Sequence, residues 1–350
     1  MKKRDYFFDN AKFILMVLVV FGHLLRTYIE DDEIIYTIYK VIYTFHMPAF
    51  ILVSGFFAKG FYEKGYAGKL AKKLIIPYLI FQVIYTVYYY YLYNKQEITF
   101  NLLDPQWALW FLVSLFCWNL MLPLFAKLGT WRGLGLSLLA ALGAGYINEI
   151  SNFLSLSRTL VFFPVFLLGY HLGKEDIKRL MCSKARIISA LTFAAVFTWF
   201  YFNKDIDYKW LLGSKPYDEL GGAEVYAMFK RLGLYGLSLA MVLSFFSFVP
   251  NKKFFFTNWG KQTLYVYLLH GFFIKFFKES SLHSFFTDAE NFILLAGISL
   301  IITIALSSDI IASLAQPIIE LRTNRLKFLK VKAIVYFQFL KNQLRKPFHG

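Results

Sequence analysis

The first apolar segment of this 350-residue chain carries ionisable side chains that lipid tolerates poorly. Lys12 and His23 are eleven residues apart. On an α-helix this spacing is three turns plus about 20°, so the two side chains share a face about 16 Å apart. Asp9 lies on the same stripe. A lysine can hold an anion and a histidine can act as a general base near neutral pH, so this face links an anion site to a candidate base.

Each of these residues also has a structural interpretation. Lys12 can extend its ammonium group to the membrane interface, and His23 can donate a hydrogen bond to a neighbouring carbonyl group. Gly22, beside the histidine, lets another element approach closely. Because Lys12 and His23 share one face, the functional interpretation is favoured.

A second histidine stands near a proline in the next apolar segment, in Phe45-His46-Met47-Pro48. A proline inside a spanning helix frees a carbonyl group and bends the axis. Counted from the ends of their segments, His23 and His46 fall at similar depth, so we expect them to face one pocket. Ser54-Gly55 follows. This pair favours close helix packing over a nucleophilic role for the serine.

Lysines gather after the second segment, at Lys69, Lys72 and Lys73. Such a cluster can bind a polyphosphate-bearing ligand, or it can serve only as the basic loop of a membrane protein. Further on, Arg158 can bind an anionic group or anchor the interface. His270 lies in the middle of an apolar segment, where a later acid, Asp309, is a possible buried partner.

The elements that position these residues are predicted to be membrane-spanning helices. The chain is 58% hydrophobic and 20% aromatic, which is too apolar for a soluble domain. Its apolar runs of about 20 residues suit helices rather than barrel strands. We therefore expect an all-α, polytopic bundle of about ten transmembrane helices in residues 1–320. The expected spans are 7–28, 35–58, 70–93, 107–126, 131–148, 159–173, 185–202, 226–248, 262–278 and 291–315.

The net charge of +16 is distributed by side of the membrane. If the first span runs outward, the cytoplasmic segments hold 26 basic and six acidic residues, against ten and fifteen on the opposite side. The positive-inside rule then places both termini in the cytoplasm. Residues 321–350 are predicted to form a basic amphipathic tail on the anionic leaflet.

This distribution argues against nucleic-acid binding, which would gather basic and aromatic residues on one soluble face. The two cysteines, Cys117 and Cys182, have neither the number nor the spacing of a disulfide framework or a metal site. We expect no metal.

The order of these motifs resembles the acyltransferase family 3 membrane proteins, and within them the fucose 4-O-acetylase-like group. The similar segments run over nearly the whole chain: Arg4-Asp5 and Phe8-Asp9-Asn10-Ala11-Lys12 before His23; Phe45-His46-Met47-Pro48 with Ser54-Gly55; Lys69 to Lys73 with Pro77-Tyr78; Leu109-Trp110-Phe111-Leu112; Arg158 through Gly169; and Tyr267-Leu268-Leu269-His270. This chain has lysine at position 12, and only lysines after the second span, where arginine is usual in the family.

The resemblance implies an acyltransferase of the bacterial cytoplasmic membrane. It would transfer an acetyl or another short acyl group, such as succinyl, from acyl-CoA to a hydroxyl of an envelope glycan or its lipid-linked precursor. His23 and His46 would be catalytic, and Lys12, Lys69, Lys72 and Lys73 would bind acyl-CoA. The acceptor would contact the four remaining candidates: Asp9, Trp110, Arg158 and His270.

Two other functions fit the same polar stripe. A transporter of glycans or lipid-linked sugars also places polar residues in its helices, but it would act without acyl-CoA. A structural subunit of an envelope complex would tolerate substitution of Lys12 and His23. Transfer by direct attack and transfer through an acylated residue have the same residue list and are both open.

Overall fold

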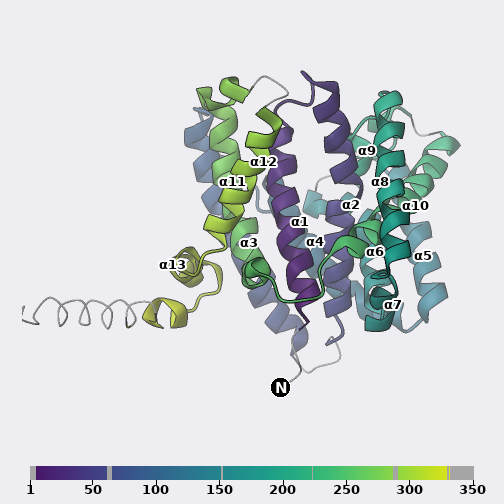
Figure 1. Cartoon of the computed structure of the whole chain (residues 1–350). Coiled ribbons are helices and arrows are strands. Elements are labelled where there is room, and N and C mark those ends of the chain that lie inside the picture. Colours follow the sequence, from purple (N-terminus) through teal and green to yellow (C-terminus); the bar gives the residue numbers. More distant parts are fainter. Residues whose placement is uncertain are drawn as a thin grey trace, which may run out of the picture.

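The computed structural model describes residues 5–60, 65–150, 153–222, 224–286, 291–328 and 331. In this part of the chain the regular structure is helical (Figure 1). The α-helices are α1 (Tyr6–Leu25), α2 (Glu33–Phe57), α3 (Tyr66–Leu92), α4 (Trp110–Ala126), α5 (Thr130–Gly143), α6 (Leu156–His171), α7 (Lys174–Arg179), α8 (Ser183–Phe202), α9 (Lys209–Leu212), α10 (Val225–Phe248), α11 (Thr263–Glu279), α12 (Asn291–Leu306) and α13 (Asp309–Ile319). Short 3₁₀ helices join some of them, including η1 (Trp107–Leu109) and η5 (Phe255–Lys261).

Each predicted span contains one of these helices, and the apolar runs explain why. Helices satisfy their own backbone groups where lipid offers no partner. Among the described residues, seven helices are long and apolar enough to cross a membrane, and the bent pair of α12 and α13 brings the number to as many as eight. The remaining two, α5 and α11, have 14 and 17 residues. The all-α membrane bundle is confirmed, and the number of ten crossings stays a prediction.

One predicted span is wrong in shape. The segment 291–315 was expected to be a single helix, but the chain bends by 64° between α12 and α13. The hydroxyl of Ser308 accepts a hydrogen bond from the backbone amide of Ile311 at 3.3 Å, so it caps a new helix. This cap starts α13 in a new direction and leaves Asp309 exposed in its first turn.

Helix α1 lies at the centre of the bundle, and its first turns are anchored by η5 (Figure 1). Asn10 is fully buried, and its amide donates to the carbonyl oxygens of Pro250 at 2.8 Å and Lys252 at 2.9 Å. A Cβ on Gly260 would lie 1.9 Å from the Asp9 carbonyl oxygen, so only glycine permits this contact. Helix α1 is thereby held in position next to the chain that leads into α11.

The closest helix contact joins α2 and α6. A Cβ on Gly55 would lie 1.9 Å from the Phe166 carbonyl oxygen, and one on Gly169 would lie 2.1 Å from the Leu52 carbonyl oxygen. The backbones therefore touch without intervening side chains, as small residues allow in membrane helices. The hydroxyl of Ser54 donates to the Phe50 carbonyl oxygen at 2.9 Å, which agrees with a packing role for Ser54-Gly55.

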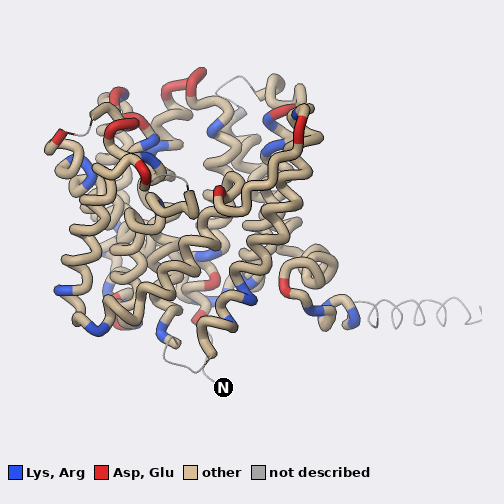
Figure 2. The backbone as a smooth tube through the Cα atoms, turned by 180° about the vertical axis from the view of Figure 1, so that it is seen from behind, with Lys and Arg blue, Asp and Glu red and all other residues tan. Residues whose placement is uncertain are grey.

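The acidic residues of the bundle gather mainly at the end opposite the N-terminus (Figure 2). This agrees with the sorting of charge in the sequence. Which end faces the cytoplasm stays a prediction, as does the amphipathic tail, because residues 332–350 lie outside the described residues.

Candidate active site

Two cavities lie beside α1, one toward each end of the helix, and four of the described residues line both of them. The first, which we call the inner cavity, has a volume of about 380 Å³ and includes Lys12, Ser54 and Lys73 in its wall. The second, the outer cavity, has a volume of about 190 Å³ and is lined by residues that include Arg26 and Arg158. Helix α1 contributes to both because it runs along them.

His23 stands where the two cavities meet. It lines both of them, together with Met47, Ala108 and Trp110. Lys12 lines the inner cavity on the same side of α1, as the spacing of the two residues predicts. Lys12 and His23 therefore line one cavity, whereas their roles as an anion site and a base stay a prediction.

The imidazole of His23 is positioned by a tyrosine from α2. Its Nδ1 lies 3.3 Å from the Tyr43 hydroxyl. A Cβ on Gly22 would lie 2.9 Å from a ring carbon of Tyr43, so the glycine makes room for this tyrosine. His23 is half-buried. With Nδ1 occupied by the hydroxyl group, Nε2 is the nitrogen left for chemistry.

Two further rings hold His23 from the side of α11. The ring centroid of Trp107 lies 4.4 Å from that of His23, and the His270 ring stacks on His23 at 5.6 Å with an interplanar angle of 26°. Lys275 lies 5.2 Å from the Trp107 ring centroid, in a cation–π contact. Trp107 has a φ of 39°, an unusual conformation for a bulky residue. This stack restricts the orientation of the imidazole.

Sequence reasoning missed Trp107. A tryptophan at the start of an apolar segment is ordinarily an interfacial residue, and only Trp110 stood out by its motif. The space for Trp107 comes from Gly271, where a Cβ would lie 2.7 Å from a ring carbon of the tryptophan. The glycine directly after His270 was the available signal.

His46 lies in the wall of the outer cavity with His23, as predicted from their depth. Its Nδ1–H donates to the Ile42 carbonyl oxygen at 2.8 Å, and the side chain is buried. Because a carbonyl oxygen only accepts, this bond assigns the proton to Nδ1 and leaves Nε2 as an acceptor. Tyr43 lies between the two histidines and contacts the ring of His46 at 4.5 Å between centroids.

The predicted acyl-CoA residues separate into two groups. Lys12 and Lys73 line the inner cavity, whereas Lys69 and Lys72 are exposed and do not line it. Asp9 is buried and pairs with Lys12 at 2.9 Å between Nζ and Oδ1. It lines neither cavity and lies far along α1 from the predicted acceptor residues.

Arg158 and Trp110 meet in the outer cavity, and their role in binding the acceptor stays a prediction. The Arg158 guanidinium carbon lies 5.0 Å from the Trp110 ring centroid. His270 does not line either cavity. It is fully buried behind His23, and its Nδ1–H donates to the Val266 carbonyl oxygen at 3.0 Å.

The proposed pairing of His270 with Asp309 is wrong. The Asp309 carboxylate accepts a hydrogen bond from Gln262 Nε2 at 3.0 Å, at the start of α11 and about two turns before His270. The bend between α12 and α13 accounts for this position.

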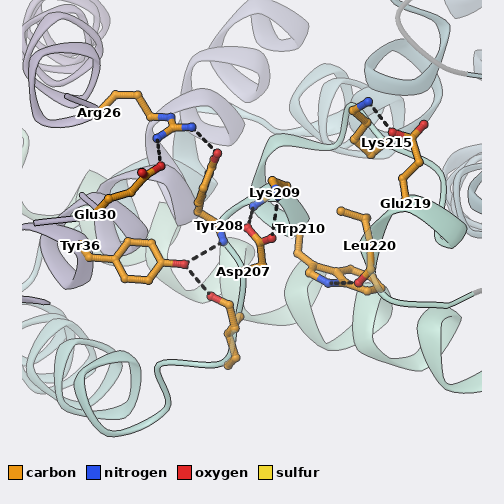
Figure 3. Close-up of polar contacts among 11 residues, drawn as sticks. Arg26, Glu30, Tyr36, Asp207, Tyr208, Lys209, Trp210, Lys215, Glu219 and Leu220 are labelled. Atoms are coloured by element: carbon orange, nitrogen blue, oxygen red, sulfur yellow. Dashed lines mark hydrogen bonds and ion pairs between the residues drawn. The ribbon is translucent and has the colours of Figure 1, made fainter. Parts of the chain in front are cut away.

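The segment between α8 and α10 covers the outer cavity. Leu211 and Leu212 of α9 line it, and the neighbouring Tyr208 holds the segment to α1 and α2. Its hydroxyl accepts a hydrogen bond from Arg26, and its backbone amide donates to the Tyr36 hydroxyl at 3.3 Å (Figure 3). We call residues 203–222 the cover segment.

Within the described ranges, no group of three or more His, Cys, Asp or Glu side chains is arranged to hold a metal ion. Cys117 and Cys182 are free thiols.

Comparisons with known proteins agree with this arrangement. A family profile described as an acyltransferase domain, that of acyltransferase family 3, matches residues 5–312. Nodulation protein NolL of Sinorhizobium fredii is 33% identical over 143 residues, which is 37% of this chain and 39% of the relative. Nodulation protein NolL of Mesorhizobium japonicum is 32% identical over 143 residues, 37% of this chain and 38% of the relative.

The aligned region thus spans less than two fifths of these relatives. No solved structure shows a significant match. The family profile, in contrast, spans nearly the whole helical bundle, including both cavities and His23. This chain belongs to acyltransferase family 3, and its described part has seven to eight helices long and apolar enough to cross a membrane.

Proposed function

We propose that this enzyme transfers an acetyl or another short acyl group from cytoplasmic acyl-CoA to a hydroxyl group of an envelope glycan or its lipid-linked precursor. The observation that carries the proposal is the position of His23, in the wall of two cavities that lie toward opposite ends of α1. One base can then reach a donor in the inner cavity and an acceptor in the outer cavity.

The inner cavity suits acyl-CoA. Lys12 and Lys73 supply positive charge at its mouth for phosphates, and the rest of its wall is mainly apolar, including Met16, Val19 and Leu112. The distance from Lys12 to His23 is roughly 16 Å along the helix, which leaves room for an extended arm to carry the thioester inward. Lys69 and Lys72 add to the field at the rim rather than contact the arm.

The chemistry follows from the free Nε2 of His23. It accepts the proton of the acceptor hydroxyl while that oxygen attacks the thioester carbon. The new C–O bond forms, the C–S bond breaks, and the CoA thiolate leaves and takes the proton from the imidazolium. Tyr43 keeps the ring oriented, and His46 assists from the outer side. A two-step route through an acylated residue uses the same groups and is the alternative to direct transfer.

The acceptor is proposed to lie in the outer cavity against Trp110 and Arg158, with His270 supporting His23 from behind. This requires the inner cavity to open to the cytoplasm, both termini to lie on that side, and the bundle to cross a bacterial cytoplasmic membrane ten times. The basic segments at the end of the bundle where α1 begins support that orientation. Asp9 would then act by orienting Lys12.

The direct test is transfer of label. Membranes containing the protein are incubated with radiolabelled acetyl-CoA, and the glycan fraction is extracted and treated with mild base. We expect base-labile label with the natural protein and with His283→Ala, whose ring Nδ1 hydrogen-bonds to the local backbone at Ser280. We expect none with His23→Ala at equal protein level.

A connected pair of cavities also suits a transporter of glycans or lipid-linked sugars. Transport of the glycan in the absence of acyl-CoA, with no label incorporated, would support that function and contradict ours. Incorporation of label at the natural rate by His23→Ala would refute the role of His23.

A further inference from the structure

The outer cavity has an unbalanced charge. Its described lining includes two arginines, Arg26 and Arg158, and two histidines, His23 and His46, but no aspartate or glutamate. The inner cavity differs, because its Lys12 already pairs with Asp9 at 2.9 Å. A cavity inside a membrane protein with cations and no acid in its wall has a positive potential, since low dielectric strengthens each charge.

Arg158 is the main source of this imbalance. In the described part of the chain its guanidinium group forms no ion pair and no hydrogen bond, and its close contact is with the Trp110 ring at 5.0 Å. Arg26 is already engaged, by the Tyr208 hydroxyl and by Glu30 at 4.0 Å. The remaining donors of Arg158 are thus available to a ligand in the cavity that Arg158 lines.

The acids closest to this wall stay outside the cavity. The carboxylate of Glu30 is 88% exposed and interacts with Arg26 from solvent (Figure 3). Asp104 is near enough to Arg158 for a favourable Coulomb interaction, but it forms no ion pair with it and does not line the cavity. Arg158 is half-buried, and a cation that is partly removed from water without a counter-ion is costly, so the site suits a ligand that supplies the negative charge.

We propose that the acceptor carries an oxyanion, a carboxylate or a phosphate, close to the hydroxyl that receives the acyl group, and that Arg158 binds it. This rests on the proposed function, and it defines the acceptor class as an acidic sugar or a sugar phosphate. A planar guanidinium group with adjacent donors matches the oxygen atoms of either group. Trp110 orients the guanidinium and offers its ring to the sugar.

A binding experiment tests this without turnover. Tryptophan fluorescence of the purified full-length protein reports on the cavity, because Trp107 and Trp110 line it. Glucuronate and glucose 1-phosphate are titrated against glucose as the neutral probe. We expect one or both oxyanions to bind at least tenfold more tightly than glucose. The difference should disappear in Arg158→Gln, persist in part in Arg158→Lys, and remain in Lys209→Gln.

Lys209 is the matched control because it is an exposed cation of the cover segment that lies outside the cavity and pairs with Asp207. The relative affinities of glucuronate and glucose 1-phosphate show whether the negative charge of the acceptor is a carboxylate or a phosphate. Binding of both no stronger than that of glucose, or equal binding by the natural protein and Arg158→Gln, would overturn the proposal.

A transfer assay distinguishes binding of the acceptor oxyanion by Arg158 from two other roles, contact with the reacting carbonyl oxygen and contact with the donor. The acceptors are the matched pair p-nitrophenyl glucuronide and p-nitrophenyl glucoside, with acetyl-CoA as donor. We expect Arg158→Gln to raise KM at least tenfold for the acidic acceptor and to leave KM for the neutral one unchanged. An equal fall in kcat with both acceptors would assign Arg158 to the reacting carbonyl oxygen instead. A defect confined to succinyl-CoA would assign it to the donor, and either result overturns the proposal.

The two assays also separate this inference from the proposed function. Selective binding of oxyanions that depends on Arg158 supports the inference even where no label is transferred. Failure of transfer with that binding intact counts against the acyltransfer chemistry alone.

Discussion

The inner and outer cavities handle charge in opposite ways. At the inner mouth the cations are accessible: Lys73 is exposed, and the Lys12 side chain keeps 25% of its surface exposed while it pairs with Asp9. In the outer cavity Arg158 lies against Trp110 without a carboxylate partner in the described structure. The first arrangement suits a ligand with several phosphates in water, whereas the second suits one group that leaves water to bind.

The strongest test of this comparison removes the imidazole of His23, one of the residues that line both cavities. His23→Ala should lower kcat by a factor on the order of 10² to 10⁴, which is the usual contribution of a general base. Binding of acetyl-CoA should stay within about twofold of the natural value, because the lysines are intact. Stopped-flow kinetics together with equilibrium binding measure both quantities. Loss of donor binding along with activity would show that the variant has damaged the inner cavity.

The next largest effect should come from the inner cations. The double variant Lys12→Gln, Lys73→Gln is expected to raise KM for acetyl-CoA by roughly tenfold with little change in kcat, because two charges that face phosphates are lost. The matched control is Lys69→Gln, Lys72→Gln, whose side chains do not line the cavity. Equal increases in KM for the two double variants would mean that the cavity mouth does not select its ligand.

Substitution of the tyrosine that holds the imidazole should have a smaller effect. Tyr43→Phe removes the hydroxyl that lies 3.3 Å from His23 Nδ1 but keeps the ring that fills the space beside Gly22. A hydrogen bond of about 0.5–1.5 kcal/mol corresponds to a fall in kcat of about two- to tenfold. Steady-state kinetics at several pH values would detect it. An unchanged kcat would show that Trp107 and His270 alone orient His23.

The smallest effect expected is that of salt. Raising ionic strength from about 0.05 M to about 0.5 M should increase KM for acetyl-CoA by about two- to threefold, since exposed charges are screened. Binding of glucuronate in the outer cavity should change less, because Arg158 is half-buried in the cavity wall whereas Lys73 is exposed. Parallel titrations in sodium chloride compare the two sites. The reverse order of sensitivity would contradict the difference between the cavities.

The sequence was sufficient to predict the helices and the shared face of Lys12 and His23, because both follow from periodicity and hydrophobic length. It also predicted that His46 and His23 face one pocket, because the two residues lie at similar depth in their segments. The sequence did not predict the rotation of α3 about its axis, because packing against neighbouring helices decides which lysines face inward. For that reason Lys73 lines the cavity and Lys69 does not.

The sequence also did not predict two other features, the position of Trp107 and the bend after α12. Trp107 reaches His23 through a strained backbone conformation and the space beside Gly271, neither of which has a local signature. The bend after α12 did have a local signature, Ser307-Ser308-Asp309, because serine followed by an acidic residue is typical of a helix start. An apolar run on both sides of it favoured a single span instead.

The contacts of Gly55 with the Phe166 carbonyl oxygen and of Gly169 with the Leu52 carbonyl oxygen have a consequence for how the site can move. They join α2 and α6, the helices that carry His46 and Arg158. We therefore expect these two helices to move as one unit. The cover segment is held as well, because Ser157 donates to the Gly213 carbonyl oxygen at 2.9 Å and the buried Tyr217 donates to the Leu142 carbonyl oxygen at 3.0 Å. We therefore expect the walls of the outer cavity to keep their shape when an acceptor enters.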